Sequence, residues 1–144
     1  MNYLLDTCVL AESRRKPVDK NLKTWLTSVS DEALFISVLT LGEIRYGIEK
    51  LLEEKCRVQL TLWLEHELTA WFGNRVLALD AETADRWGYL RACHRTLPAT
   101  DSLLAATAMT RHLTLVTRNV KDFTSIDGLK ILNPWETGRS GLPV

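Results

Sequence analysis

The chain has 144 residues, of which 46% are hydrophobic and 25% are charged, as expected for one soluble globular domain. Its 18 basic and 18 acidic residues give a formal net charge of zero, so the total charge does not identify a nucleic-acid binder, although a neutral total can hide a local basic surface. No apolar run reaches the roughly 18 residues of a membrane span, so we expect no membrane partner. The first ten residues include Asp6 and no basic leader, so we expect no signal peptide and a cytoplasmic location.

The first half of the chain alternates short apolar runs with helical patterns. Residues 2–5 form an apolar run that ends in Asp6-Thr7, which indicates a buried strand followed by a capped helix start. After a turn at residues 15–17, apolar side chains recur at helical spacing over residues 18–29. Residues 34–38 favour pleated structure and predict a second buried strand. Two helices are then expected, over residues 39–54 and 55–72.

The second half continues this alternation. A turn at Gly73-Asn74 precedes a predicted strand over residues 76–79, and Asp80 has the position of the N-cap of a helix over residues 81–96, which Leu97-Pro98 ends. An alanine-rich helix is predicted from Thr100 to Arg111, followed by strands over residues 113–117 and 130–132. We expect one domain over residues 1–135 and a flexible tail over residues 136–144. The pattern predicts an α/β fold with a mainly parallel sheet of about four to five strands.

The cysteines are odd in number and far apart, so no disulfide framework is expected, and we interpret them as reduced, mostly buried thiols: Cys8, Cys56 and Cys93. The three histidines have neither metal-ligand spacing nor the partners of a catalytic triad, so zinc is not expected. Two basic clusters, at residues 14–16 and at Arg91, His94 and Arg95, could form a local basic surface. They are equally compatible with solvated helix faces.

Candidate chemistry lies where predicted strands end. Asp6 directly follows the first strand, Glu43 lies in the first turns of the helix after the second strand, and Asp101 lies at the start of its helix. Asn119 and Asp122 follow the fourth strand. Ligands of open parallel sheets bind at the carboxyl ends of the strands, so we expect these side chains to meet at one edge.

Carboxylates held close together repel and raise each other's pKa unless a cation lies between them. Mg²⁺ prefers oxygen ligands, keeps several waters and stabilises charge on a phosphodiester during displacement. The three acids therefore predict a metal site that acts on phosphodiesters. Thr7 and Thr117 are secondary candidates that would add a hydroxyl or hold a water, although they also fit ordinary strand-end threonines.

Each acid also has a structural interpretation. Asp6 fits a simple helix cap. Asp101 fits a residue placed at the positive end of a helix dipole. Glu43 fits a surface glutamate beside two helix-packing glycines, Gly42 and Gly47. Because each glycine costs a helix roughly 1 kcal/mol relative to alanine, their presence equally suggests that something approaches Glu43 closely.

Four segments together, in this order and spacing, resemble the VapC/FitB-like branch of the PIN-domain family. They are Tyr3–Thr7, Thr40–Gly47, Ala99–Ala108 and Leu115–Asn119, and the ending Leu132–Trp135 is similar as well. The resemblance implies a PIN-like three-layer fold. It further implies a metal-dependent endoribonuclease, with Mg²⁺ or Mn²⁺ as cofactor, that acts as the toxin of a type II toxin–antitoxin pair. Homodimers and a cognate VapB-like antitoxin, through which operator DNA is bound, are implied partners.

By motif position, Asp6, Glu43 and Asp101 match the acidic metal ligands of that family. The resemblance has two departures. Cys8 stands where the family usually has asparagine, and Asn119 stands where many members have a fourth acid, so either the site rests on three carboxylates or Asp122 compensates. Our hypothesis is that Asp6 and Asp101 hold one or two metals, with Glu43 as a ligand or water orienter.

Arg45 is a further candidate, for contact with phosphate or with an antitoxin carboxylate. Two competing enzyme classes fail on sequence alone, because neither the second aspartate of a haloacid-dehalogenase-type phosphatase nor the paired acids of a receiver domain are present. One alternative survives: a catalytically idle PIN domain that binds an antitoxin and supports operator DNA binding. The RNA that would be cut is open, with single-stranded loops favoured because their bases can be read.

Overall fold

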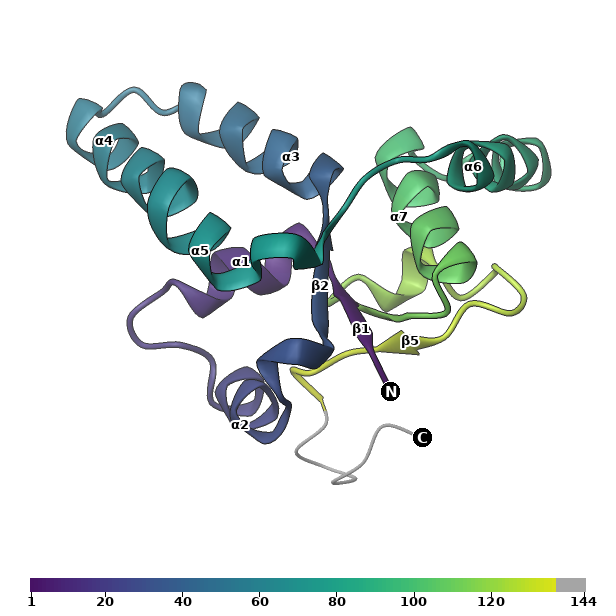
Figure 1. The fold of residues 1–144 in the computed structure, drawn as a ribbon, viewed down its shortest axis with the longest axis horizontal. Coiled ribbons are helices and arrows are strands. Elements are labelled where there is room, and N and C mark those ends of the chain that lie inside the picture. Colours follow the sequence, from purple (N-terminus) through teal and green to yellow (C-terminus); the bar gives the residue numbers. More distant parts are fainter. Residues whose placement is uncertain (137–144) are drawn as a thin grey trace.

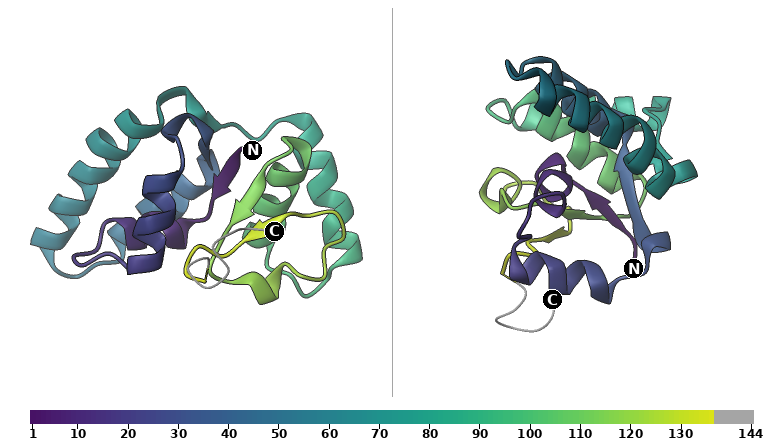
Figure 2. Two further views of the ribbon diagram at one scale, coloured as in Figure 1. Left: turned by 90° about the horizontal axis from the view of Figure 1, so that it is seen from below. Right: turned by 90° about the vertical axis from the view of Figure 1, so that its left-hand side faces the viewer.

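A parallel sheet lies between two layers of helices in the computed structural model, which describes residues 1–136 (Figure 1). The predicted tail, apart from Glu136, falls outside the described residues. The two helical layers diverge above the sheet as two arms, and the view from below shows the strands between them (Figures 1 and 2). The predicted α/β, three-layer architecture is confirmed.

Within residues 1–136 the sheet has five strands, all parallel, in the order β3-β2-β1-β4-β5. Their bounds are β1 Tyr3–Leu5, β2 Leu34–Ser37, β3 Val76–Leu77, β4 Thr114–Val116 and β5 Ile131–Leu132. β1 is central, and it pairs Tyr3 with Leu34 of β2 and with Thr114 of β4. Each predicted strand is present, shortened at one or both ends. Parallel pairing brings all five carboxyl ends to the same edge.

Alternation along the strands creates two separate cores. Tyr3 and Leu5 of β1 pack into one cluster, whereas Leu4 packs into the other. The first cluster also contains Val9 and Leu22, from the helices of one layer, and the second contains Leu104, from the other layer. Side chains of a strand point alternately to opposite faces, so a sheet covered on both faces needs mainly apolar strands, as these are apart from Ser37 and Thr114 at strand ends.

The helices match the predicted order, and several of their bounds differ from the prediction. They are α1 Thr7–Ser13, α2 Lys20–Ser28, α3 Val38–Glu49, α4 Glu54–Leu62, α5 Thr69–Phe72, α6 Ala81–Cys93 and α7 Ala99–Thr110, with a π-helical segment η2 Trp63–Leu68 and 3₁₀ turns η1 Asp31–Ala33, η3 Gly73–Arg75 and η4 Val120–Asp122. No helix within residues 1–136 combines the length and the apolar character that crossing a membrane requires.

The predicted helix over residues 39–54 was too long. α3 ends at Glu49, and Leu52 is 96% exposed in the connection to α4, so it does not extend the apolar face of α3. The helix predicted over residues 55–72 contains the π-helical segment η2, which hydrophobic periodicity did not indicate. The helix predicted over residues 81–96 ends at Cys93, where the backbone of His94 leaves the helical region with φ −128° and ψ 73°.

The cysteines are free thiols, as predicted, but they are not mostly buried. Cys8 and Cys56 are half-buried and Cys93 is exposed. Cys93 is the last residue of α6, where the helix ends at the protein surface. The prediction of a buried thiol is therefore wrong for Cys93, whose position at the end of the helix does not face the core.

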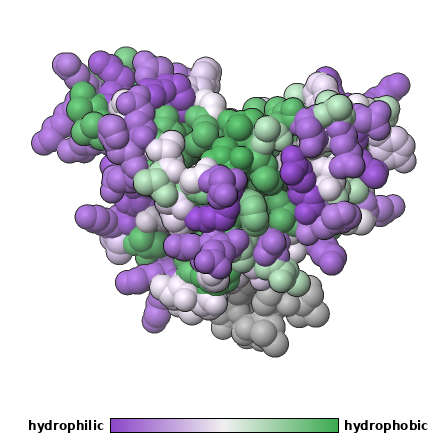
Figure 3. Space-filling model, in the orientation of Figure 1, coloured by the Kyte–Doolittle hydropathy of each residue, from purple (hydrophilic) through white to green (hydrophobic). Residues whose placement is uncertain are grey.

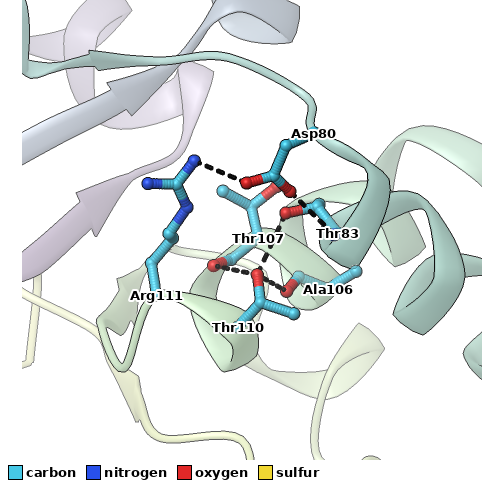
Figure 4. A network of polar contacts seen from close by, with 6 residues as sticks. All are labelled: Asp80, Thr83, Ala106, Thr107, Thr110 and Arg111. Atoms are coloured by element: carbon cyan, nitrogen blue, oxygen red, sulfur yellow. Dashed lines mark hydrogen bonds and ion pairs between the residues drawn. The ribbon is translucent and has the colours of Figure 1, made fainter.

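A polar network joins α6 to α7 and so fixes the direction of α7 (Figure 4). Asp80 caps α6 by accepting a bond of 2.9 Å from the Thr83 N–H, as predicted, and it forms an ion pair of 3.0 Å with Arg111 at the end of α7. The Thr83 and Thr110 hydroxyls lie 3.0 Å apart. The Thr83 bonds, with a smaller contribution from Arg111, lower the pKa of Asp80. These contacts hold the far end of α7, so its first turn, which carries Asp101, lies at the carboxyl edge of the sheet.

Candidate active site

The carboxyl edge of the sheet collects the candidate residues as predicted. β1 leads directly into Asp6, β2 leads into α3 with Glu43, and β4 leads into Thr117. The carboxylates of Asp6 and Glu43 both act on the pKa of Asp101, in the first turn of α7. Elements that are far apart in the sequence thus carry their acids to one place.

Asp6 is both a helix cap and a buried site residue. The residue is 8% exposed and occupies the N-cap position of α1, where its Oδ1 accepts a bond of 2.7 Å from the Thr7 N–H at the first residue of the helix. Its Oδ2 accepts a bond of 2.8 Å from the hydroxyl of the fully buried Thr117. A cap uses only the first of these oxygens, so the second bond holds the carboxylate in an orientation that capping alone does not need.

Glu43 is held from the α1 side. The Thr7 hydroxyl donates a bond of 2.8 Å to Glu43 Oε1, so one residue bonds to Asp6 through its backbone and to Glu43 through its side chain. The interpretation of Gly42 and Gly47 as helix-packing glycines is wrong, because a Cβ at either position would meet nothing within 4 Å. Gly42 instead lines an open hollow together with Glu43.

Asp101 is the electrostatically unusual member of the site. Burial, followed by the negative charges of Asp6, Asp122 and Glu43, raises the pKa of its carboxyl from 3.8 to about 6. No residue in the described part of the chain donates a hydrogen bond to its side chain. The helix dipole interpretation is therefore insufficient, because the repulsion and the loss of water outweigh the favourable position at the start of α7.

Asn119 and Asp122 take different places around this site. The Asn119 N–H donates a bond of 3.1 Å to the Thr117 hydroxyl, which in turn holds Asp6. Asn119 therefore acts on the site through its backbone, and its side chain is exposed. Asp122, in η4, raises the pKa of Asp101 by more than Glu43 does, so its carboxylate contributes to the same negative field.

Cys8 lies against the carboxylate of Asp6. Its Sγ is 3.8 Å from Asp6 Oδ2 and 3.9 Å from the Thr117 Oγ1. Burial, followed by the negative charge of Asp6, raises the pKa of the Cys8 thiol, so at neutral pH it is a neutral donor and not a thiolate. The position that departs from the family pattern thus still directs a donor at Asp6.

Arg45 does not lie with the acids. Its guanidinium forms ion pairs with Glu65 of η2 at 2.6 Å and with Glu49 of α3 at 3.4 Å. These bonds join the π-helical segment to α3 and raise the pKa of Arg45, chiefly through Glu65. The contacts with phosphate or with an antitoxin carboxylate that the sequence suggested remain predictions, and either would have to displace a glutamate of this chain.

An apolar surface borders the acids on the side of α3. Val38, Tyr46 and Leu79 are 39%, 66% and 42% exposed, and they line the same hollow as Glu43. In the space-filling view, hydrophobic side chains gather in the valley between the two helical arms (Figure 3). Apolar side chains gathered on one face beside a polar site are typical of a binding surface.

The acids have the oxygen ligands that divalent metal ions prefer, but they do not form a complete set of protein ligands. Within residues 1–136, no three acidic, histidine or cysteine side chains converge as a set of metal ligands. Mg²⁺ needs only one or two carboxylates because it keeps several of its waters. The raised pKa of Asp101 indicates negative charge that the described side chains do not compensate, and a cation between Asp6 and Asp101 would stabilise it.

Comparison with known proteins gives one consistent family. The family model described as the PIN domain matches residues 3–129. The curated protein named toxin FitB from Neisseria gonorrhoeae is 32% identical, and the match covers 92% of this chain and 97% of FitB. The protein named VapC ribonuclease Y4jK from Sinorhizobium fredii is 30% identical, over 92% of this chain and 97% of its own.

Solved structures agree with these relatives. A chain in the crystal structure of FitAcB from Neisseria gonorrhoeae superposes on this protein with a TM-score of 0.86 and is 32% identical to it. The match covers 93% of this chain and 99% of that one. A structure of FitAB bound to an IR36 DNA fragment gives a TM-score of 0.82 and 30% identity, over 92% of this chain and 95% of that one. The fold therefore agrees along nearly the whole length of each pair of chains.

Proposed function

Because this chain belongs to the PIN domain family, we propose that it is a metal-dependent endoribonuclease that acts as the toxin of a toxin–antitoxin pair. The observation that carries the proposal is the partly buried cluster of acids at the carboxyl edge of the sheet, where burial, followed by the negative charges of Asp6, Asp122 and Glu43, raises the pKa of Asp101 to about 6. A bound Mg²⁺ or Mn²⁺ would stabilise the charge that develops on a phosphodiester during its hydrolysis. Asp6 and Asp101 are the side chains that would hold it.

The remaining residues position these carboxylates. Thr117 donates to Asp6 Oδ2 and Thr7 donates to Glu43 Oε1, so a threonine hydroxyl orients each of these two carboxylates. Glu43 Oε2 has no donor among residues 1–136. We assign to this oxygen the role of orienting an attacking water or of making a further contact with the metal. Such positioning contacts resemble the outer partners that orient metal ligands in other enzymes.

The fourth acid of the site is assigned to Asp122 in this proposal. Its charge acts on Asp101, whereas Asn119 contributes a backbone N–H to Thr117. Asp122 is exposed, so water can stay between its carboxylate and a metal. The amide of Asn119 offers no charge, so it would contribute less than a carboxylate to holding a divalent cation.

The proposed partners are an antitoxin, a second copy of the chain and RNA. The relative named FitB is called a toxin, and the solved FitAB structure is bound to DNA. We expect a cognate VapB-like antitoxin to hold this chain inactive in the cytoplasm and to supply the contact with operator DNA. The exposed apolar side chains of Val38, Tyr46 and Leu79 fit a homodimer, which light scattering on the purified protein would detect as twice the chain mass.

Cleavage of total RNA by purified protein, free of antitoxin, tests this function. We expect cleavage with Mg²⁺ or Mn²⁺, and loss of cleavage with EDTA and in Asp101→Asn. Asp85→Asn is the matched control, because Asp85 is an exposed aspartate of α6 that does not act on Asp101. If the folded wild-type protein neither cleaves RNA nor binds a divalent metal, the result would favour the alternative function, a catalytically idle domain that binds an antitoxin and supports operator DNA binding.

A further inference from the structure

A polar hollow adjoins the acids on the side away from α3. It lies between the connection from α6 to α7 and the η4 turn. The side chains that matter for its chemistry are His94 and Arg95 on one wall and Lys121 and Asp122 on the other. Asp122 is shared with the proposed metal site, whereas Arg95 and Lys121 have no role there and carry the opposite charge.

Backbone hydrogen bonds hold both walls of the hollow next to the segments that carry the acids. On one wall, the Pro98 carbonyl accepts a bond of 3.0 Å from the N–H of Ser102, the residue that follows Asp101. On the other wall, the Asp122 N–H donates a bond of 3.2 Å to the Asn119 carbonyl. The Asn119 N–H continues the connection through Thr117 to Asp6. The position of the hollow relative to the acids is therefore set by the same contacts that order the site.

The cations of the hollow have no acidic partner in the part of the chain that the structure describes. Several arginines elsewhere are neutralised in ion pairs, as Arg45 is by Glu65 and Arg111 is by Asp80. Within residues 1–136, Arg95 and Lys121 form no salt bridge, and both are exposed. Their charges are available to a ligand, while Asp122 lies close enough to Asp101 to act on it.

We propose that this hollow binds a backbone phosphate of the RNA strand next to the phosphate that is cut. The proposal rests on the nuclease function, because it names how that site holds its substrate. A strand that reaches the acids must bring its negative phosphates past Asp6, Asp101 and Asp122, which repel it. Arg95 and Lys121 offset that repulsion one step along the strand, and the contact is independent of base sequence because it involves only the backbone.

RNA binding in EDTA tests the hollow without cleavage. The probe is a fluorescently labelled single-stranded RNA of random sequence, and its anisotropy is measured at several salt concentrations. We expect Arg95→Gln combined with Lys121→Gln to lower the affinity at low salt by about tenfold. The slope of log affinity against log salt should become shallower by about 0.7 for each phosphate of a single strand that the variant no longer neutralises.

Control variants distinguish the effect of the positive charges in the hollow from the effect of exposed positive charges elsewhere on the surface. Lys23→Gln combined with Lys55→Gln removes two exposed cations that do not line the hollow, and it should leave the salt slope unchanged. Arg95→Lys combined with Lys121→Arg keeps both charges and should retain most of the affinity. Asp122→Asn should strengthen binding, because it removes a repulsive carboxylate from the same wall.

An unchanged affinity and salt slope in the Arg95→Gln, Lys121→Gln variant would overturn the proposal, and so would an equal loss of affinity in the Lys23→Gln, Lys55→Gln control. A loss confined to binding of a protein partner would assign the hollow to that partner and would also overturn it. Binding is measured without divalent metal and so does not depend on cleavage. If the wild-type protein fails to cleave RNA in the separate assay with Mg²⁺ or Mn²⁺, that result counts against the nuclease function alone. Loss of binding in the hollow variant would then still support a phosphate site.

Discussion

The start of α1 and the start of α7 place an aspartate at the same edge of the sheet, yet the two carboxylates have opposite surroundings. Asp6 is buried and accepts bonds from the Thr7 N–H and the Thr117 hydroxyl, with the Cys8 thiol as a third donor. Asp101 has no donor within residues 1–136, and its pKa is raised to about 6. Position at a helix start does not by itself determine the state of a carboxylate.

The difference follows from what each helix start provides. α1 begins at Asp6 itself, so the carboxylate takes the N–H that the helix leaves unbonded. α7 begins after Pro98, without a side-chain cap, and Asp101 lies within its first turn facing other acids. The carboxylate of Asp6 is therefore held in one orientation by its donors, whereas the charge of Asp101 lacks such donors within residues 1–136 and would be stabilised by a cation.

The largest expected effect follows from removing the negative charge of either aspartate. Asp6→Asn and Asp101→Asn should each lower the rate of RNA cleavage by about a hundredfold or more, since a metal contributes several kcal/mol of stabilisation to the charge in the transition state. Initial rates with a defined RNA and saturating Mn²⁺ measure this. A variant that kept the wild-type rate would remove its aspartate from the metal site.

A smaller loss should follow when the hydroxyl that orients Asp6 is removed. Thr117→Val keeps the shape of the side chain but leaves Asp6 Oδ2 without its bond of 2.8 Å. We expect cleavage to fall by about tenfold and the concentration of Mn²⁺ needed for half-maximal activity to rise. Thr110→Val is the control, because it breaks a hydroxyl contact with Thr83 in the α6–α7 network. Equal losses in both variants would indicate a general effect on stability and not one on Asp6.

The pH dependence of cleavage should report on Asp101. Its charged form predominates above a pKa of about 6 and is lost below it. With Mn²⁺ below saturation, activity should therefore rise through about pH 6 and level off above about pH 7. Raising the Mn²⁺ concentration should move the midpoint to lower pH, since a cation favours the charged carboxylate. A midpoint that stays fixed at all Mn²⁺ concentrations would contradict this assignment.

The smallest expected effect is on stability, and it has opposite signs for the two aspartates. The pKa of Asp101 is higher in the folded protein than its ordinary value of 3.8, so the folded state binds that proton more tightly. Stability is then lost as pH rises from about 4 to about 6, and the loss is complete above that range. At about pH 8 without metal, Asp101→Asn should raise Tm by a few degrees, whereas Asp6→Asn should lower it.

Calorimetric scans at about pH 8 and about pH 4 would check this prediction. The advantage of Asp101→Asn should disappear at the lower pH, where the wild-type carboxyl is also neutral. Partial exposure of Asp101 screens its repulsion, which keeps the expected shift small. A destabilised Asp101→Asn at both pH values would mean that its carboxylate makes a favourable contact in the folded chain.

The order of strands and helices could be predicted because each apolar run has a length and period typical of its element. The break after Glu49 could not, because Leu51 and Leu52 continue an apolar pattern, although Leu52 is 96% exposed. The π-helical turns of η2 were also not predicted, since a π-bulge changes the hydrogen bonding without an evident change in composition.

In the site, chain position alone located Asp6, Glu43 and Asp101 at the edge of the sheet. The bond from Thr7 to Glu43 joins residues that are 36 positions apart, and no local pattern predicts it. The effect of Asp122 on Asp101 depends on the η4 turn, which composition did not indicate. Arg45 was a sequence candidate for contact with phosphate or an antitoxin carboxylate, but it follows Glu43 by two positions, and on a helix two such side chains do not share a face.

In the proposed site, the acids form one electrostatic unit that a divalent cation stabilises. Carbon-detected NMR titration of the aspartate carboxyls, with and without Mg²⁺, measures the pKa of Asp101 directly. We expect a pKa of about 6 without metal and a clear decrease when Mg²⁺ is added. An ordinary aspartate pKa that does not respond to Mg²⁺ would mean that the carboxylates are independent, and it would contradict the proposed metal site.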